Sequence, residues 1–203
     1  MKTPRLFFII AIIALIIGGT ACKGIGNKNT SSDDSTKVDT LWNAKVQDTF
    51  FDTKFGASRE EVIENFAKHG FSLYEDYSQD NFLVFNHTPK DIFEFGGMLW
   101  ENLHVHLVND KFYAIRFYTP TKDKATAISD FKRIAEVVSQ KYKLTEIESE
   151  DTTIYYKKRM YSKSGITGVI VCYRYESADK EIFYTAELGY YDSNLDEEVF
   201  DGL

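Results

Sequence analysis

Apolar and polar residues alternate in two adjacent segments in the middle of the chain, 99–108 and 112–118. Successive side chains of a strand point to opposite faces, so these segments predict a β-hairpin with one apolar face. A shift of one residue would turn every side chain to the other face, so the loop length must keep the apolar residues together. A three-residue loop over 109–111 does so, with the pairs Leu103–Phe117, Val105–Ile115 and Leu107–Tyr113.

Two segments have the periodicity of amphipathic helices. Residues 123–142 place apolar side chains at three- and four-residue steps, which predicts a helix long enough to cross the sheet and cover its apolar face. Ser58 and Glu61 have the spacing of a capping box and begin a shorter helix, whose buried side includes Phe66. Gly70 follows where a left-handed residue ends a helix.

The order of elements is the same in both halves of the chain, because each reads as one helix followed by four strands. We therefore predict an α+β fold, with an antiparallel sheet of about eight strands in two helix-plus-hairpin halves and two helices packed on one face. The folded domain spans residues 45–192, with a possible internal repeat of 45–119 and 120–192.

A second hairpin is predicted over residues 168–191 and is rich in aromatic residues. Tyr173 and Tyr175 alternate in step with valines and are expected in the core. Phe183 and Tyr191 then fall on the opposite face. Aromatic side chains on a polar sheet face are either a contact surface or ends tucked under a loop.

The first 22 residues have the parts of a bacterial export signal. Lys2 and Arg5 form a basic start, residues 6–17 are continuously apolar, and small residues precede Cys22. This segment resembles the signal peptide of bacterial lipoproteins, in which a cysteine after the cleavage site receives a diacylglycerol thioether. Gly19 stands where that family usually has leucine. The resemblance implies lipid attachment at Cys22; ordinary secretion with an unmodified cysteine, or a retained anchor, are the alternatives.

The segments outside the folded domain follow from this resemblance. Residues 1–21 are then the signal peptide, 22–44 a polar flexible tether, and 193–203 an acidic tail. Acyl chains such as palmitate on Cys22 would hold the domain at a membrane of the cell envelope. Lys23 is not the aspartate that retains lipoproteins in the inner membrane of the best-known sorting systems. The resemblance therefore implies the outer membrane, with the domain facing the periplasm or the cell surface.

Charge and cysteine content narrow the classes of function. The chain carries 24 basic and 31 acidic residues, and loss of Lys2 and Arg5 with the leader changes the net charge from −7 to −9. This balance argues against binding to nucleic acid, which needs a basic surface. If Cys22 carries lipid, Cys172 is left without a disulfide partner, and its apolar neighbours predict a small buried core residue.

The folded region resembles a group of small exported α/β domains that includes the beta-lactamase-inhibitor-protein fold and the small lipoproteins of outer-membrane assembly. In that group a glycine, a capping serine or threonine and a helix valine open each unit, and Gly56, Ser58 and Val62 match them. The assembly lipoproteins usually have Gly-x-Pro after the helix, whereas residues 70–72 lack the proline. The resemblance implies a non-catalytic domain that binds other proteins through a sheet face or loops.

His104 and His106 are the only histidines with a spacing suited to a metal, because alternate residues of a strand share a face. A zinc site needs three or four ligands, so these two are weak candidates, and the alternative is that they are solvent-facing strand residues. No pattern predicts catalytic residues or a cofactor.

We therefore expect a membrane-anchored lipoprotein with a non-catalytic protein-binding domain, and not an enzyme. The alternative is a lipoprotein that holds a sugar or another small molecule in the concavity of the sheet.

Overall fold

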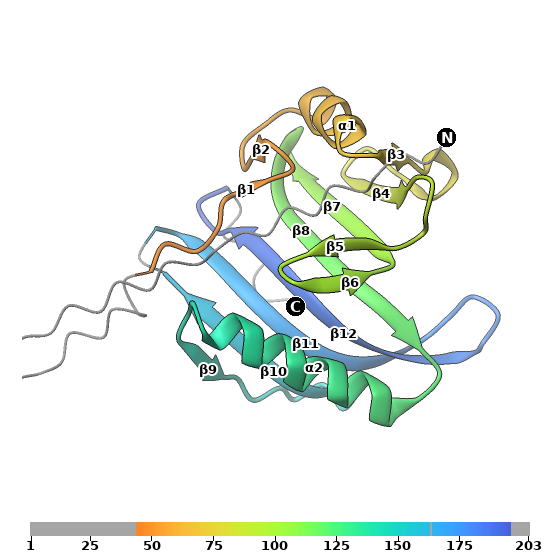
Figure 1. Ribbon diagram of the computed structural model, residues 1–203, viewed down its shortest axis with the longest axis vertical. Helices are drawn as coiled ribbons and strands as arrows, with labels where there is room; N and C mark the ends of the chain where they lie inside the picture. The colour runs from red at the N-terminus through yellow and green to blue at the C-terminus, as the bar shows by residue number, and fades with distance from the viewer. Residues whose placement is uncertain (1–43, 163, 196–203) are drawn as a thin grey trace, which may run out of the picture. The chain divides into compact units, whose positions relative to one another are not determined.

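The main feature of the computed structural model, which describes residues 44–162 and 164–195, is an eight-stranded antiparallel sheet (Figure 1). The predictions for the leader, for Cys22 and for most of the tether and tail lie outside the described residues. Across the sheet the order is β3 (Phe71–Leu73), β4 (Phe82–His87), β7 (Asn102–Val108), β8 (Lys111–Thr121), β12 (Ile182–Asp192), β11 (Ile166–Glu176), β10 (Ile154–Tyr161) and β9 (Leu144–Glu146).

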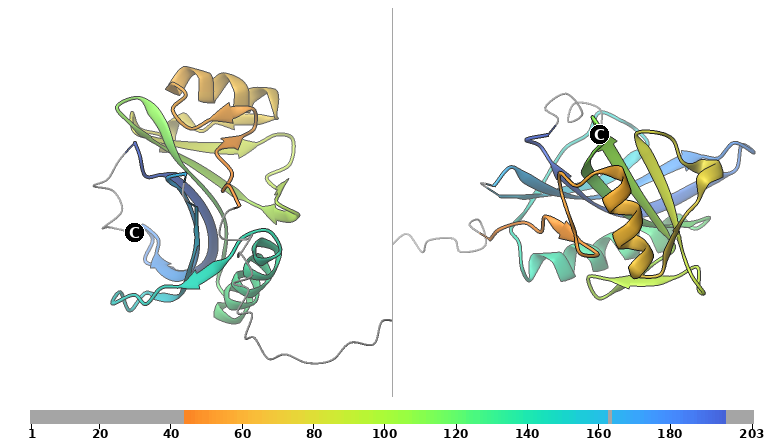
Figure 2. Two further views of the ribbon diagram at one scale, coloured as in Figure 1. Left: turned by 90° about the vertical axis from the view of Figure 1, so that its left-hand side faces the viewer. Right: turned by 90° about the horizontal axis from the view of Figure 1, so that it is seen from above.

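Two helices, α1 (Arg59–Lys68) and α2 (Lys124–Ser139), pack on the same face of this sheet (Figures 1 and 2). Each half of the chain contributes one helix and four adjacent strands, and the last strands of the halves, β8 and β12, pair at the centre. The predicted α+β fold is confirmed. An origin of the halves in an internal repeat stays a prediction.

Side chains cap the N-termini of both helices. The Ser58 hydroxyl accepts a hydrogen bond from the amide of Glu61, whose carboxylate accepts one from the amide of Ser58, so the predicted capping box is confirmed. Gly70 has φ +85° and follows the end of α1, as expected. Asp123 caps α2. Neither helix of the described residues is long and apolar enough to cross a membrane.

The central hairpin, β7–β8, has the predicted register in its middle, with the pairs Leu103–Phe117 and Val105–Ile115. Its tip differs from the prediction. The loop contains only Asn109 and Asp110, both with positive φ, which is a type I′ turn. Leu107 therefore pairs with Phe112, and a β-bulge inserts Tyr113 as an extra residue in β8. Because the bulge absorbs the shift, Phe112 and not Tyr113 enters the core.

The second hairpin, β11–β12, corrects the predicted faces of β11. Tyr173 pairs with Thr185, and Tyr175 pairs with Phe183. Both tyrosines lie on the face of the sheet that points away from the helices, and not in the core. Cys172 lies on the helix side and is fully buried. The prediction was wrong because β11 has apolar residues at both parities, and periodicity alone cannot choose the buried face of such a strand.

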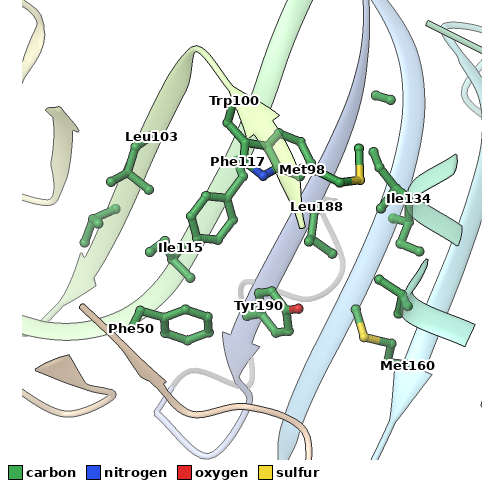
Figure 3. Packing of buried hydrophobic residues seen from close by; sticks show 14 of the residues in the cluster. Phe50, Met98, Trp100, Leu103, Ile115, Phe117, Ile134, Met160, Leu188 and Tyr190 are labelled. Carbon is green, nitrogen blue, oxygen red and sulfur yellow. The ribbon is translucent and has the colours of Figure 1, made fainter. Parts of the chain in front are cut away.

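Two short hairpins complete the core on the helix side, and no pattern in the sequence predicted them. They are β1 (Thr49–Phe50) with β2 (Thr53–Lys54), and β5 (Phe93–Phe95) with β6 (Met98–Trp100). The ring of Phe117 in β8 is central: Phe95 stacks on it at 4.2 Å between ring centroids, and Trp100 and Phe50 approach it from two further directions (Figure 3). Aromatic packing of this kind dominates core energetics.

The turn of the central hairpin yields a stability prediction. Asp110 has φ +61°, which is unfavourable for a residue with a Cβ, so Asp110→Gly should raise the free energy of unfolding by about 0.5 kcal/mol. Urea unfolding followed by circular dichroism measures this change. Asp179→Gly is the matched control, because the φ of Asp179 is not positive, and it should not be stabilising. A loss of stability in Asp110→Gly would contradict the assigned turn.

Candidate functional site

The face of the sheet opposite α1 and α2, here called the helix-free face, carries a charged pair at its centre. Arg116 of β8 donates from Nε to Glu187 Oε1 at 2.7 Å and from Nη2 to Glu187 Oε2 at 2.5 Å, a bidentate arrangement. The hydroxyl of Tyr173 in β11 donates to Glu187 Oε2 at 3.0 Å. Three strands thus converge on one carboxylate, which is only 3 % exposed.

Arg116 remains charged in this environment. Burial alone would lower the pKa of Arg116, but the charge and hydrogen bonds of Glu187 outweigh burial and raise it above its ordinary value. Gly189 lies opposite Arg116 in the sheet, and a Cβ at this position would come within 2.6 Å of the Tyr191 hydroxyl. The absence of a side chain at residue 189 therefore lets Tyr191 fold back across β12 toward the ion pair.

The two candidate metal ligands lie beside this pair. His104 pairs directly with Arg116 across β7 and β8, and its Nε2 is 2.8 Å from the hydroxyl of Tyr118. His106 lies two residues further along the same face, and Phe82 packs edge-on against both imidazole rings. Both histidines lie on the face that no helix covers and are half-buried there.

Both histidines are held neutral. Burial, with the nearby charge of Arg116, lowers the pKa of His104 to about 3 and that of His106 to about 4. Among residues 44–162 and 164–195, no group of three or more His, Cys, Asp or Glu side chains is placed to hold a metal ion. The structure does bring the two imidazoles to one face, beside a guanidinium that would repel a cation. The metal site stays a prediction.

Aromatic side chains extend the helix-free face on both sides of the ion pair. Tyr175 stacks on Phe183 with ring centroids 5.7 Å apart, and the Tyr173 ring lies 6.1 Å from that of Tyr175. At the other end, a small apolar cluster contains Tyr113 and Tyr191. These rings are half-buried or buried although no helix covers them, because they pack laterally on one another. The face is therefore rich in aromatic rings that contact one another, and the two charges at its centre compensate each other.

Cys172 lies on the other side of the sheet and takes no part in this site. It is free, fully buried, and burial raises the pKa of its thiol to about 11, which disfavours the reactive thiolate. The prediction of a small buried core residue is confirmed.

The alternation of residues in the sequence places His104 and His106 on one face, but it did not predict the ion pair, and it placed Tyr173 in the core. The available signal was one arginine and one glutamate, each the only charged residue inside a strand segment that is mostly apolar and aromatic. The two residues are 71 positions apart, and their meeting depends on the pairing of β8 with β12. Compared with protein-family models, curated proteins and solved structures, the chain has no match.

The ion pair predicts a stability hierarchy. Glu187→Ala leaves a largely buried guanidinium without its carboxylate and should lower the free energy of unfolding by about 3–5 kcal/mol. Replacing both charges together, by Arg116→Met with Glu187→Leu, should cost less than Glu187→Ala alone, because no buried charge is then left unpaired. Urea unfolding of the three proteins measures the order. A double variant less stable than Glu187→Ala would contradict this account.

The histidines predict a loss of stability in mild acid. In the unfolded chain they protonate near pH 6.5, whereas in the folded protein they stay neutral down to about pH 4, so the unfolded state binds more protons between these values. Stability should therefore fall from pH 7 to pH 5, by about 1–2 kcal/mol per histidine. The variant His104→Gln with His106→Gln should have a flatter profile of unfolding free energy against pH. Equal slopes in the variant and the parent would contradict the assigned neutral state.

Proposed function

We propose that the protein is a bacterial lipoprotein, anchored to a membrane of the cell envelope through lipid on Cys22, whose domain binds a protein partner without catalysing a reaction. The residue types of the helix-free face, and the contacts that hold them in place, support the binding part of this proposal. The proposed membrane location rests on the leader, whose apolar run and small residues before Cys22 resemble a lipoprotein signal peptide.

Residue types on the helix-free face favour a protein partner. Tyrosine and arginine are enriched among the few residues that supply most of the binding energy at protein interfaces. Here Arg116 is bound to Glu187 at two points and lies 3.4 Å from the hydroxyl of Tyr173, and Tyr175 lies beside Tyr173. Side chains that are already fixed lose little conformational entropy when a partner binds.

The width of the face agrees with this interpretation. Half-buried aromatic or imidazole rings occur on β4, β7, β8, β11 and β12, so the face crosses most of the sheet. A protein partner covers a surface of this kind, whereas a small ligand is enclosed by a pocket. The tether predicted before residue 44 would let the domain reach a partner away from the lipid surface.

Partner capture tests the binding proposal. Membranes of the native host are treated with a cross-linker, the full-length protein is recovered, and co-purifying proteins are quantified by mass spectrometry. Replacing Tyr175 and Phe183 by alanine should reduce capture of the main partner about 10-fold, since loss of such aromatic contacts costs more than about 1 kcal/mol each. Tyr156→Ala is the matched control, because this exposed tyrosine stacks on Phe131 at the helix side and should leave capture unchanged.

Further measurements test the membrane location separately from the binding of a partner. Cys22→Ser should move the protein out of the membrane fraction while leaving its partner recognition in solution intact. Capture that is equal for the parent and the face variant would contradict binding through the helix-free face. Binding to a glycan array without capture of any protein would favour the small-molecule alternative instead.

A further inference from the structure

Two basic side chains of β10, here called the basic strip, lie at one end of the helix-free face. Lys157 and Arg159 are two residues apart in this strand, so both point to the same side of the sheet. They pair with Val171 and Val169 of β11, which belong to the small apolar cluster around Tyr191 (Figure 1). Both basic side chains are half-buried. This end of the face therefore combines two positive charges with apolar surface.

The two cations of the basic strip are close enough to act on each other. Burial lowers the pKa of Lys157, and the positive charge of Arg159 lowers it further. Glu187 lies on the same face, but its carboxylate already accepts hydrogen bonds from Arg116 and Tyr173. A negatively charged segment beside the strip would stabilise both cations, so the strip favours an acidic occupant.

The end of β12 leads the chain to this strip. The amide and the hydroxyl of Ser193 donate to the carbonyl of Gly165, and the amide of Leu195 donates to the carbonyl of Asp192, which together form a turn. The side chain of Leu195 then packs against the small apolar cluster that contains Val169. The last described residue thus lies on the helix-free face, one strand away from the basic strip.

The sequence that follows Leu195 is acidic. Residues 196–203 lie outside the described residues, and they contain four acidic side chains, at positions 196, 197, 198 and 201, and no basic one. Three residues of extended chain span about 10 Å, whereas neighbouring strands are about 5 Å apart. From Leu195, the carboxylates of residues 196–198 can therefore reach Arg159 and Lys157 without a change in the described structure.

We propose that residues 196–198 dock on the basic strip of their own chain, with their carboxylates paired to Lys157 and Arg159. The position of Leu195 and the opposite charges of the two segments select this occupant. Exposed ion pairs are individually weak, but a short covalent connection gives an effective concentration in the millimolar range, so weak pairs suffice within one chain.

The docked segment covers one end of the helix-free face. It lies at the β10–β11 end and leaves Tyr175 and Phe183, at the far end of their strands, uncovered. An acidic segment of a partner protein would compete for the same strip. This consequence rests on the proposed function, whereas the docking itself does not.

Zero-length cross-linking tests the docking. A water-soluble carbodiimide joins a carboxylate to a lysine amine, with loss of one water molecule, when the two groups are in contact. The full-length protein is held in phosphatidylcholine nanodiscs and the linked peptides are quantified by mass spectrometry. We expect an amide between Lys157 and residue 196, 197 or 198. A mixture of isotope-labelled and unlabelled protein distinguishes links within one chain, which we expect, from links between two chains.

A neighbouring lysine is the matched control. Lys158 lies next to Lys157 in β10 but on the other face of the sheet, where its Nζ is 3.2 Å from Glu146. Its yield of links to residues 196–198 should be at least about 10-fold lower, because alternate strand residues face opposite sides. Arg159→Gln removes one cation and should lower the Lys157 yield about 3-fold. Sodium chloride at about 1 M should also lower it, because salt screens exposed charges.

Three results would overturn the proposal. The first is a Lys157 yield no higher than that of Lys158. The second is linkage only between labelled and unlabelled chains, which would assign the basic strip to a second copy of the protein. Both are measured on the parent protein, so they do not depend on the folding of a variant. The third is a Lys157 yield that neither salt nor Arg159→Gln changes.

Discussion

The antiparallel pairing of β8 with β12 is the contact on which the rest of the structure depends. These strands are the last of their respective halves, and their pairing makes one eight-stranded sheet from two four-stranded ones. On the helix side it sets Phe117 opposite Leu188 at the centre of the core. On the other side it brings Arg116 within hydrogen-bond distance of Glu187. The core and the candidate site therefore lie on opposite faces of the same two strands, and both depend on the register between β8 and β12.

The ion pair has a structural consequence beyond its own net energy. A buried ion pair contributes little stability relative to apolar residues of the same shape, because desolvation offsets most of the attraction. A slip of one residue between β8 and β12 would, however, turn either Arg116 or Glu187 into the aromatic core. An unpaired charge there is far more costly than a lost apolar contact, so the pair opposes wrong registers more strongly than it stabilises the correct one.

The two faces of the sheet differ in how they are closed. The helix side is covered by α1, α2 and two short hairpins, and a pocket lies between the β5–β6 hairpin and α2. The helix-free face is closed only by its own side chains, through ring stacking, the bidentate pair and the hydrogen bond between Tyr118 and His104. The first arrangement buries the core, and the second leaves a broad surface of side chains without a covering layer.

The sequence by itself determined the elements whose causes are local. The capping box at Ser58, the stripe of α2 and the pairing of Val105 with Ile115 all depend on residues within a few positions or across one short turn. The placement of His104 and His106 on one face followed from the same alternation. The lipid attachment at Cys22 is a prediction of the same local kind.

Tertiary structure decided what depends on distant segments. β11 is apolar at both parities, so only its place in the sheet settled that Cys172 is buried in the core while Tyr173 joins Glu187. The bulge at Tyr113 reconciled a two-residue turn with an apolar core. The strand order and the Arg116–Glu187 pair follow from the packing free energy of the whole domain, because no local pattern encodes which distant strands or hairpins become neighbours.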